Sequence, residues 1–374
     1  MRIWFDILTP KQIMFFKYFV ERLKKDNHDI LCTGREYREA KELALLKKIN
    51  IKSIGKHGGD NKFEKLNAST ERAYLLSEII NSFNPNLTVS FSSPEAARVS
   101  FGLGIKHFNF NDSPHATAVA KLTIPLVDRL FCPWVIPFKE WTKFGLEKDK
   151  ITRYRALDPI VWVKKELENI NNQEVIKMKK SLNIEEGKKV ILIRPEEIKA
   201  SYIADKKLKN SIEVIEKIVN NFSNKYNILI LARYKDQIDF YKERFEKKIG
   251  TKVIETVTDG MLLLRIADLF IGAGGTMSAE AALIGKPVIS ITPINFHVEN
   301  YLIKTGLIKK ISNSNTLNKY IKSILSTEAQ SINEKKSTFT NSISQQDKIN
   351  KISRTITSNM EDPIEIFKKF LLDP

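Results

Sequence analysis

A glycine-rich turn between an apolar stretch and a helix of small residues is the segment of this sequence best suited to chemistry. Residues 267–287 read ADLFIGAGGTMSAEAALIGKP, with Gly274, Gly275 and Thr276 in the turn. Glycines let the backbone approach a ligand closely, and the first turn of the following helix offers free N–H groups at its positive end. Glu280 lies one helical turn after Thr276, where a carboxylate can accept hydrogen bonds from a ribose diol. The turn therefore predicts a diphosphate site, and tight packing of strand against helix is the alternative.

Two arginines are expected at the same edge of the second predicted sheet. Arg194 ends the apolar stretch 190–193, and Arg233 ends the stretch 228–232. A guanidinium is planar and permanently charged, so it fits diphosphate oxygens and would stabilise a departing nucleoside diphosphate without a metal ion. The sequence has no Asp-x-Asp motif and no His-x-x-x-His pair, and we expect neither a metal nor a cofactor. A surface salt bridge is the alternative for each arginine.

Candidate general bases follow the strands predicted in the first half. Asp112 and His115 come directly after the stretch 106–110 and are close enough to share one ligand. An imidazole titrates near neutral pH, so His115 could take a proton from an acceptor hydroxyl while Asp112 orients it. The alternative is structural: Asp112 or Ser113 caps a helix that begins at Pro114, and His115 is exposed.

Asp6 and the loop 56–59 are further candidates in this half. Asp6 follows the first apolar stretch and is a second candidate base. Its alternative is to cap the helix near Pro10. The loop 56–59 reads KHGG, which could bind an anion or could be a bare glycine turn.

The alternation of apolar stretches with helical patterns predicts an α/β protein built from parallel βαβ units. With 374 residues, two domains are expected. We expect a Rossmann-like N-terminal domain over 1–158, a Rossmann-like C-terminal domain over 159–360, and a C-terminal helix over 361–374 that packs back on the first domain. Strands are expected at 2–8, 29–33, 51–54, 87–91, 106–110, 126–132 and 151–154, and then at 189–194, 227–232, 252–254, 269–271, 287–291 and 307–309.

The net charge of +17, from 61 basic and 44 acidic residues, invites a nucleic-acid interpretation. The excess is mostly lysine spread over predicted helix faces, so a solvated surface is favoured and nucleic acid is not expected as a partner. Attraction to anionic lipid or to a phosphate-bearing substrate is the alternative. The helix after Pro10 would contact a membrane if Phe15 and Tyr18 were exposed, and core packing is the other outcome.

The composition excludes wholesale disorder and a disulfide framework. Hydrophobic residues are 42% of the chain, charged residues are 28%, and Cys32 and Cys132 are the two cysteines. No apolar run reaches the ~18 residues of a transmembrane helix, and residues 1–6 lack the apolar core of a signal peptide. We therefore expect a cytoplasmic protein with reduced thiols, with peripheral contact at the inner face of the membrane as an addition.

The segments 274–281 (GGTMSAEA) and 285–287 (GKP) resemble the nucleotide-sugar signature of GT-B-fold enzymes. UDP-N-acetylglucosamine 2-epimerases and the peptidoglycan N-acetylglucosaminyltransferase carry similar segments. The resemblance implies that the glycine turn binds the donor diphosphate and that Glu280 binds the ribose. The segment 297–300 (HVEN) resembles the stretch near the donor sugar, which implies a sugar contact for Asn300.

A second resemblance covers nearly the whole chain. It is carried by the segments 2–6, 55–59, 92–98, 101–105 and 110–112. They are similar to a largely archaeal prokaryotic family that is known only as a domain of unknown function with a GT-B-like fold. The resemblance implies two Rossmann-like parallel-sheet domains facing a central cleft. The chain departs from this family at Gln12 and Met14, where relatives tend to have histidines.

Together these features predict a glycosyltransferase that uses a nucleotide sugar, with UDP as the expected nucleotide, on a glycan or lipid-linked acceptor. A UDP-sugar 2-epimerase is the first alternative. The stretch 90–94 lacks the aspartate and the stretch 194–197 lacks the histidine of such enzymes, and only Asp112 resembles an expected acid. A protein that binds the nucleotide sugar without catalysis is the second alternative.

Overall fold

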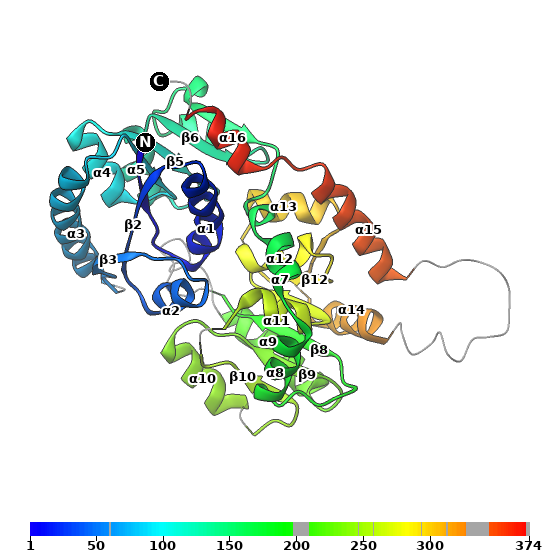
Figure 1. The fold of residues 1–374 in the computed structure, drawn as a ribbon. Helices are drawn as coiled ribbons and strands as arrows, with labels where there is room; N and C mark the ends of the chain where they lie inside the picture. Colours follow the sequence, from blue (N-terminus) through cyan, green and yellow to red (C-terminus); the bar gives the residue numbers. More distant parts are fainter. Residues whose placement is uncertain are drawn as a thin grey trace. The chain divides into compact units, whose positions relative to one another are not determined.

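The computed structural model describes residues 1–59, 61–196, 209–245, 247–256, 258–292, 294–311, 313–326 and 344–371. They form two compact units, and the colours of Figure 1 follow the sequence through both of them. Unit 1 comprises Met1–Trp162 and Glu361–Pro374, and unit 2 comprises Val163–Met360. Each unit contains a parallel sheet with helices, so the predicted α/β class is confirmed.

Unit 1 is built on a seven-stranded sheet in the order β3-β2-β1-β4-β5-β6-β7. Its strands are β1 (Arg2–Asp6), β2 (Asp29–Glu36), β3 (Lys52–Lys56), β4 (Leu87–Ser90), β5 (Lys106–Phe110), β6 (Arg129–Pro133) and β7 (Ile151–Tyr154). The chain extends the sheet to one side of β1 and then adds β4 on its other side. In open α/β sheets, ligands bind outside the carboxyl ends of the strands at such a reversal.

Helices cover both faces of this sheet. They are α1 (Pro10–Lys25), α2 (Arg38–Leu46), α3 (Lys62–Phe83), α4 (Pro94–Leu103), α5 (Thr117–Thr123), α6 (Lys139–Thr142) and α16 (Pro363–Lys369), with 3-10 turns at Ile124–Leu126, Lys148–Lys150 and Asp158–Val161. Successive side chains of a strand point to opposite faces. Trp4 packs with Leu76 of α3, whereas the Phe5 ring lies 5.3 Å from that of Phe16 in α1. In Figure 1, α3 and α4 accordingly lie on one side of the sheet and α1 on the other.

Helix α1 joins the sheet through buried aromatic rings. Phe15, Phe16 and Phe19 are fully buried, and Tyr18 is 6% exposed. The Phe19 ring lies 5.5 Å from that of Phe367, so α16 shares the same core. Core packing is therefore the outcome for α1. The membrane contact that exposed Phe15 and Tyr18 would have provided is ruled out for this face, because neither ring is exposed.

Unit 2 is built on a six-stranded sheet in the order β10-β9-β8-β11-β12-β13. Its strands are β8 (Val190–Arg194), β9 (Asn227–Ile230), β10 (Thr251–Val253), β11 (Leu269–Gly272), β12 (Val288–Ser290) and β13 (Ile308–Lys310). Its helices are α7 (Val163–Asn169), α8 (Asn172–Ser181), α9 (Lys209–Phe222), α10 (Lys235–Phe245), α11 (Gly260–Ile266), α12 (Thr276–Leu283), α13 (His297–Lys304), α14 (Ser314–Ser326) and α15 (Gln345–Ser358). The strand order reverses between β8 and β11, which places the second expected ligand edge there.

Both cysteines are buried thiols. Cys32 and Cys132 form no disulfide, and burial raises the pKa of each thiol to about 12. Such thiols are unreactive at neutral pH. No helix within the described ranges is both long enough and apolar enough to cross a membrane.

Candidate functional site

The glycine turn lies at the strand-order reversal of unit 2. Gly272, the last residue of β11, pairs with Arg194, the last residue of β8. Gly274 and Gly275 follow with φ angles of 92° and 90°, which favour glycine. Helix α12 then begins at Thr276, and no side chain caps its first turn. Free N–H groups therefore lie at the carboxyl edge of the sheet, which is an arrangement that binds anions.

Close packing explains part of the glycine content of this turn. A Cβ atom on Gly274 would lie 3.1 Å from Phe296 Cε2, and one on Gly272 would lie 2.7 Å from Ser278 Oγ. Gly275 is different, because it is exposed and no atom lies within 4 Å of its Cβ position. The packing alternative therefore accounts for Gly272 and Gly274, and the tip of the turn stays open to a ligand.

Two buried polar side chains near the turn were not predicted from the sequence. Ser278 in α12 is 2% exposed and Glu299 in α13 is 4% exposed, and within the described residues neither side chain has a hydrogen bond of normal geometry. Burial raises the pKa of Glu299, although the nearby Ser290 hydroxyl and Lys310 ammonium lower it. Unpartnered buried polar groups are costly, so they call for an explanation such as a missing ligand. The sequence offered no signal for either beyond its place in this segment.

Glu280 and Asn300 lie on the two helices that follow the turn. Glu280 is buried in α12 at 8% exposed, and Asn300 is half-buried in α13. The two helices are in contact with each other. Hydrogen bonds from Glu280 to a ribose and from Asn300 to a sugar remain predictions.

Both predicted arginines lie at the carboxyl edge that carries the turn. Arg194 Nη1 donates to the Leu231 carbonyl at 2.8 Å, and the Ala273 N–H donates to the Arg194 carbonyl at 3.2 Å. Arg233 follows β9, and its backbone N–H donates to Gln237 Oε1 at 2.9 Å. The structure therefore brings Arg194 and Arg233 to the ends of neighbouring strands, and their contact with a diphosphate remains a prediction.

Asp6 is enclosed by donors and does not face an open edge. It is fully buried, and its Oδ1 and Oδ2 accept from Arg72 Nη2 at 2.6 Å and Nη1 at 3.0 Å. Thr33 and Ser93 each donate a hydroxyl to it at 2.6 Å. Burial raises the pKa of Asp6, but Arg72 more than offsets this, and the pKa lies below its ordinary value. Asp6 therefore has a structural role in place of the base role expected from the sequence, and the cap of α1 is Thr9.

Asp112 belongs to an ion-pair cluster at the carboxyl edge of unit 1. Lys11 Nζ, in the first turn of α1, lies 2.5 Å from Asp112 Oδ2 and 2.7 Å from Asp158 Oδ2. Asp158 also accepts a hydrogen bond from the Tyr154 hydroxyl. Burial raises the pKa of both acids, but Lys11 brings that of Asp112 below its ordinary value, whereas that of Asp158 stays above. Neighbouring acids whose pKa values shift in opposite directions are typical of acid–base sites.

His115 lies in the turn that follows Asp112. Helix α5 begins at Thr117, so the helix start expected at Pro114 is wrong, and neither Asp112 nor Ser113 caps a helix there. The Ser113 hydroxyl donates to Asp112 Oδ1 at 2.9 Å instead. Burial and Lys11 have the largest effects on the pKa of Asp112. His115 has a smaller effect and lowers this pKa. The two predicted residues therefore share one region, and His115 is half-buried in it.

Gln12 stands where the resembling family tends to have a histidine, and it fixes the loop after β1. Its Oε1 accepts from the Leu8 N–H at 2.6 Å, and its Nε2 donates to the Phe91 carbonyl at 3.0 Å. The stretch 90–94 begins at the last residue of β4 and is rich in serine, and Ser90 Oγ lies 2.9 Å from His107 Nε2. Burial lowers the pKa of His107 to about 3. Hydrogen bonds within the fold therefore occupy positions where an epimerase was expected to have reactive groups.

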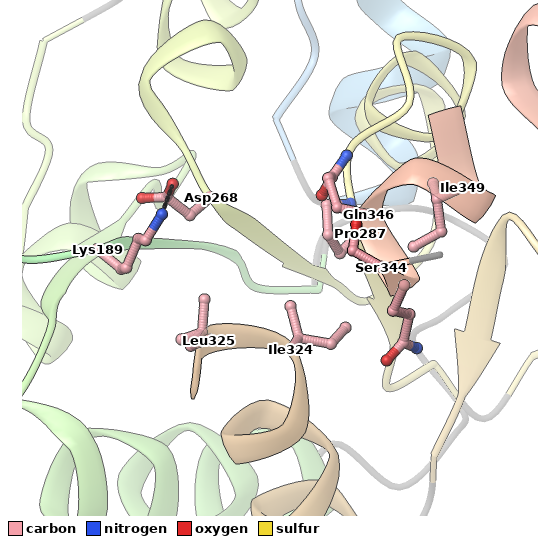
Figure 2. A pocket seen from close by; sticks show the side chains of 9 residues that line it. Lys189, Asp268, Pro287, Ile324, Leu325, Ser344, Gln346 and Ile349 are labelled. Atoms are coloured by element: carbon pink, nitrogen blue, oxygen red, sulfur yellow. Dashed lines mark ion pairs between the residues drawn. The ribbon is translucent and has the colours of Figure 1, made fainter. Parts of the chain in front are cut away.

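The cavity in Figure 2 lies at the other edge of the sheet of unit 2. Lys189, Asp268 and Pro287 line it, and they precede β8, β11 and β12, so they mark the amino ends of these strands. Leu325 of α14 and Ile349 of α15 close it from the helical side. None of the predicted site residues lines this cavity, and we do not assign it to the predicted site.

Comparison with protein families and relatives agrees with the resemblance found in the sequence. A family model described as "Protein of unknown function (DUF354)" matches residues 1–358. The uncharacterized protein MJ0665 of Methanocaldococcus jannaschii is 28% identical over 323 residues, which are 83% of this chain and 89% of that protein.

Solved structures share the fold at low sequence identity. The UDP-GlcNAc 2-epimerase of Neisseria meningitidis, bound to UDP-GlcNAc, matches with a TM-score of 0.72 at 15% identity over 100% of both chains. The UDP-GlcNAc 2-epimerase of M. jannaschii, with UDP-GlcNAc and UDP, matches with a TM-score of 0.68 at 18% identity over 96% of this chain and 100% of that one. A glycosyltransferase of Rickettsia africae matches with a TM-score of 0.63 at 16% identity over 100% of this chain and 99% of that one. These matches confirm the predicted GT-B-like fold.

Proposed function

This chain belongs to the family described as a protein of unknown function (DUF354), and from that premise we propose that it is a glycosyltransferase that uses a nucleotide sugar with UDP as the nucleotide. The observation that carries the proposal is the turn of Gly274, Gly275 and Thr276 at the strand-order reversal of unit 2. It combines an open glycine tip, an uncapped helix start and a buried glutamate one turn further on. The neighbours of known structure that are named for UDP-GlcNAc reactions support the nucleotide.

Unit 2 holds the donor in this proposal. The N–H groups at the start of α12 bind the diphosphate, and Glu280 accepts hydrogen bonds from the ribose. Arg194 and Arg233 stabilise the negative charge of the departing nucleoside diphosphate. Asn300 contacts the donor sugar.

Unit 1 holds the acceptor, with Asp112 and His115 as the candidate bases. The acceptor hydroxyl oxygen forms a new bond to the anomeric carbon, the bond from that carbon to the diphosphate breaks, and the base takes the hydroxyl proton. Asp112 is ionised but is held by Lys11, so it is better suited to orient a partner than to accept the proton. His115 therefore takes the base role.

Binding tests the donor site first. The full chain is titrated calorimetrically with UDP, UDP-GlcNAc, GDP, CMP and dTDP, and unfolding is followed at about 100 times the Kd, where a ligand adds about 2.7 kcal/mol. We expect UDP compounds to bind the natural protein and to bind Glu280→Gln at least tenfold more weakly. Glu243→Gln is the control, because Glu243 is an exposed glutamate on α10 of the same unit. If no nucleotide binds, the proposal fails.

Product analysis separates transfer from the epimerase alternative, which the named epimerase neighbours favour. NMR spectra of UDP-GlcNAc with the protein alone would show a new sugar configuration if the protein is an epimerase. A transferase leaves the donor sugar unchanged and releases UDP at an appreciable rate only with an acceptor. Binding without any turnover across a set of acceptors would favour the non-catalytic alternative.

A further inference from the structure

Arg35 of unit 1 is half-buried, and no described residue forms a hydrogen bond or an ion pair with its guanidinium. Its Nε atom is buried and has no hydrogen-bond partner within the described part of the chain. Burial lowers the pKa of Arg35, and Arg72 lowers it further by repulsion, although the negative charges of Glu95 and Asp6 act to raise it. Arginine stays charged in proteins, so this is a desolvated cation for which no described residue provides an ion pair. An anionic group of a ligand would remove that cost.

The backbone at Arg35 departs from the regular ladder. Strand β2 pairs with β3 at Gly34 and again at Glu36, and the register shifts between these two residues. Such irregularities re-aim a side chain and are common next to binding sites. Arg35 also lies near the carboxyl ends of β2 and β3, which is the edge where ligands of parallel sheets bind.

Tyr37 and His57 lie at the same two strand ends. Their rings are stacked, with centroids 5.3 Å apart and an interplanar angle of 25°. The Gly59 N–H donates to His57 Nδ1 at 3.2 Å, which places the proton of a neutral imidazole on Nε2. Tyr37 is also close enough to influence the charge of Arg35. A cation, a ring N–H and an aromatic surface therefore meet at this edge.

We propose that this edge of unit 1 is an oxyanion-binding site, in which Arg35 binds the phosphate or carboxylate group of a saccharide and the Tyr37–His57 pair packs against its ring. A guanidinium presents parallel N–H groups that match either oxyanion. On the proposed function this ligand is the acceptor, so the acceptor is an anionic sugar. The binding step itself needs no nucleotide in unit 2.

The test titrates the full chain with pyrophosphate, with glucuronate and with neutral glucose at low ionic strength, where charge attraction is least screened. We expect one of the two anions to bind and glucose not to bind. The anion whose binding Arg35→Gln weakens identifies phosphate or carboxylate as the group recognised at this edge, because pyrophosphate can also bind the glycine turn of unit 2. Arg35→Gln should weaken that binding at least ~10-fold, because it removes a charge-assisted contact. Arg38→Gln is the matched control, since the Arg38 side chain is 52% exposed three residues further on, and it should bind as the natural protein does.

Two further readouts keep the outcomes distinct. Arg35→Gln should keep or raise the melting temperature, because it removes a buried charge that no described residue pairs. A lower melting temperature would assign Arg35 to the fold and overturn the proposal. Unchanged anion affinity in Arg35→Gln, or no anion binding by the natural protein, would also overturn it. UDP is titrated into the same samples. Anion binding without UDP binding supports the oxyanion site of unit 1 and overturns the proposed transferase function. UDP binding without anion binding overturns the oxyanion site and leaves the proposed transferase function standing.

Discussion

Arg72 on α3 donates two hydrogen bonds to Asp6 at the end of β1, and neither side chain is more than 1% exposed. The pair joins α3 to β1, the strand at which the strand order of the sheet reverses. Arg72 Nε also donates to the Ile54 carbonyl at 2.9 Å, so one guanidinium links β1, β3 and α3. The fold thus uses a buried ion pair at the edge where a ligand site was expected.

Asp6→Ala should lower the free energy of unfolding of unit 1 by about 3–5 kcal/mol, because it leaves the Arg72 guanidinium buried without its partner. The measurement is urea unfolding followed by tryptophan fluorescence. All four tryptophans lie in unit 1, so this signal reports on that unit. Glu365→Gln is the control. It breaks the exposed pair with Arg22 at 3.1 Å and should change stability by less than about 1 kcal/mol. Equal effects of the two changes would contradict this prediction.

His107 should make unit 1 less stable in mild acid. Its pKa falls from an ordinary value of 6.5 to about 3 in the fold, mainly because of burial. Between these pH values His107 is therefore protonated in the unfolded chain and neutral in the folded chain. Stability is full above pH ~6.5 and falls as the pH decreases, by about 2 kcal/mol down to pH ~4.5. His107→Asn should be less stable at pH 7 and should lose this part of the pH slope. A variant with the same slope as the natural protein would show that other groups cause it.

Phe367 should stabilise unit 1 by packing helix α16 against its core. Its ring is fully buried and lies 5.5 Å from Phe19 and 5.8 Å from Phe131. Phe367→Ala should cost about 3–5 kcal/mol in tryptophan-detected unfolding, because it leaves a cavity. Phe370→Ala, three residues further on and only half-buried, should cost clearly less. A small effect of Phe367→Ala would mean that α16 contributes little to this core.

The sequence was most informative where neighbours in the chain are also neighbours in space. The glycine turn, Thr276 and the start of α12 are consecutive residues, so their arrangement could be predicted from local rules. The alternation of strands and helices in the same way predicted both sheets. The start of α5 was missed by three residues, because Ser113 bonds to Asp112 in a local turn that competes with a helix cap.

The candidate site was less predictable where partners are distant in the sequence. Asp6 was expected to be a base, but its partner Arg72 is 66 residues away and no local pattern marks the pair. Lys11 and Asp158 are 147 residues apart, and together with Asp112 they form one cluster that only the folded chain shows. Strand ends alone therefore identify the edge that can bind a ligand, but not which of its charges are already paired.

Gly275 should be needed for ligand binding as well as for the backbone conformation of the turn. Its φ of 90° and ψ of −172° lie in a region that is essentially restricted to glycine, so Gly275→Ala should cost about 1–3 kcal/mol of unit 2 stability. Gly187→Ala is a matched control, because Gly187 also has a positive φ of 81°, has no atom within 4 Å of its Cβ position, and precedes the amino end of β8. Both variants should lower the melting temperature, and calorimetry should show weaker UDP binding for Gly275→Ala alone. Equal UDP affinity in the two variants would mean that the turn serves the packing of β11 against α12 and does not bind the diphosphate.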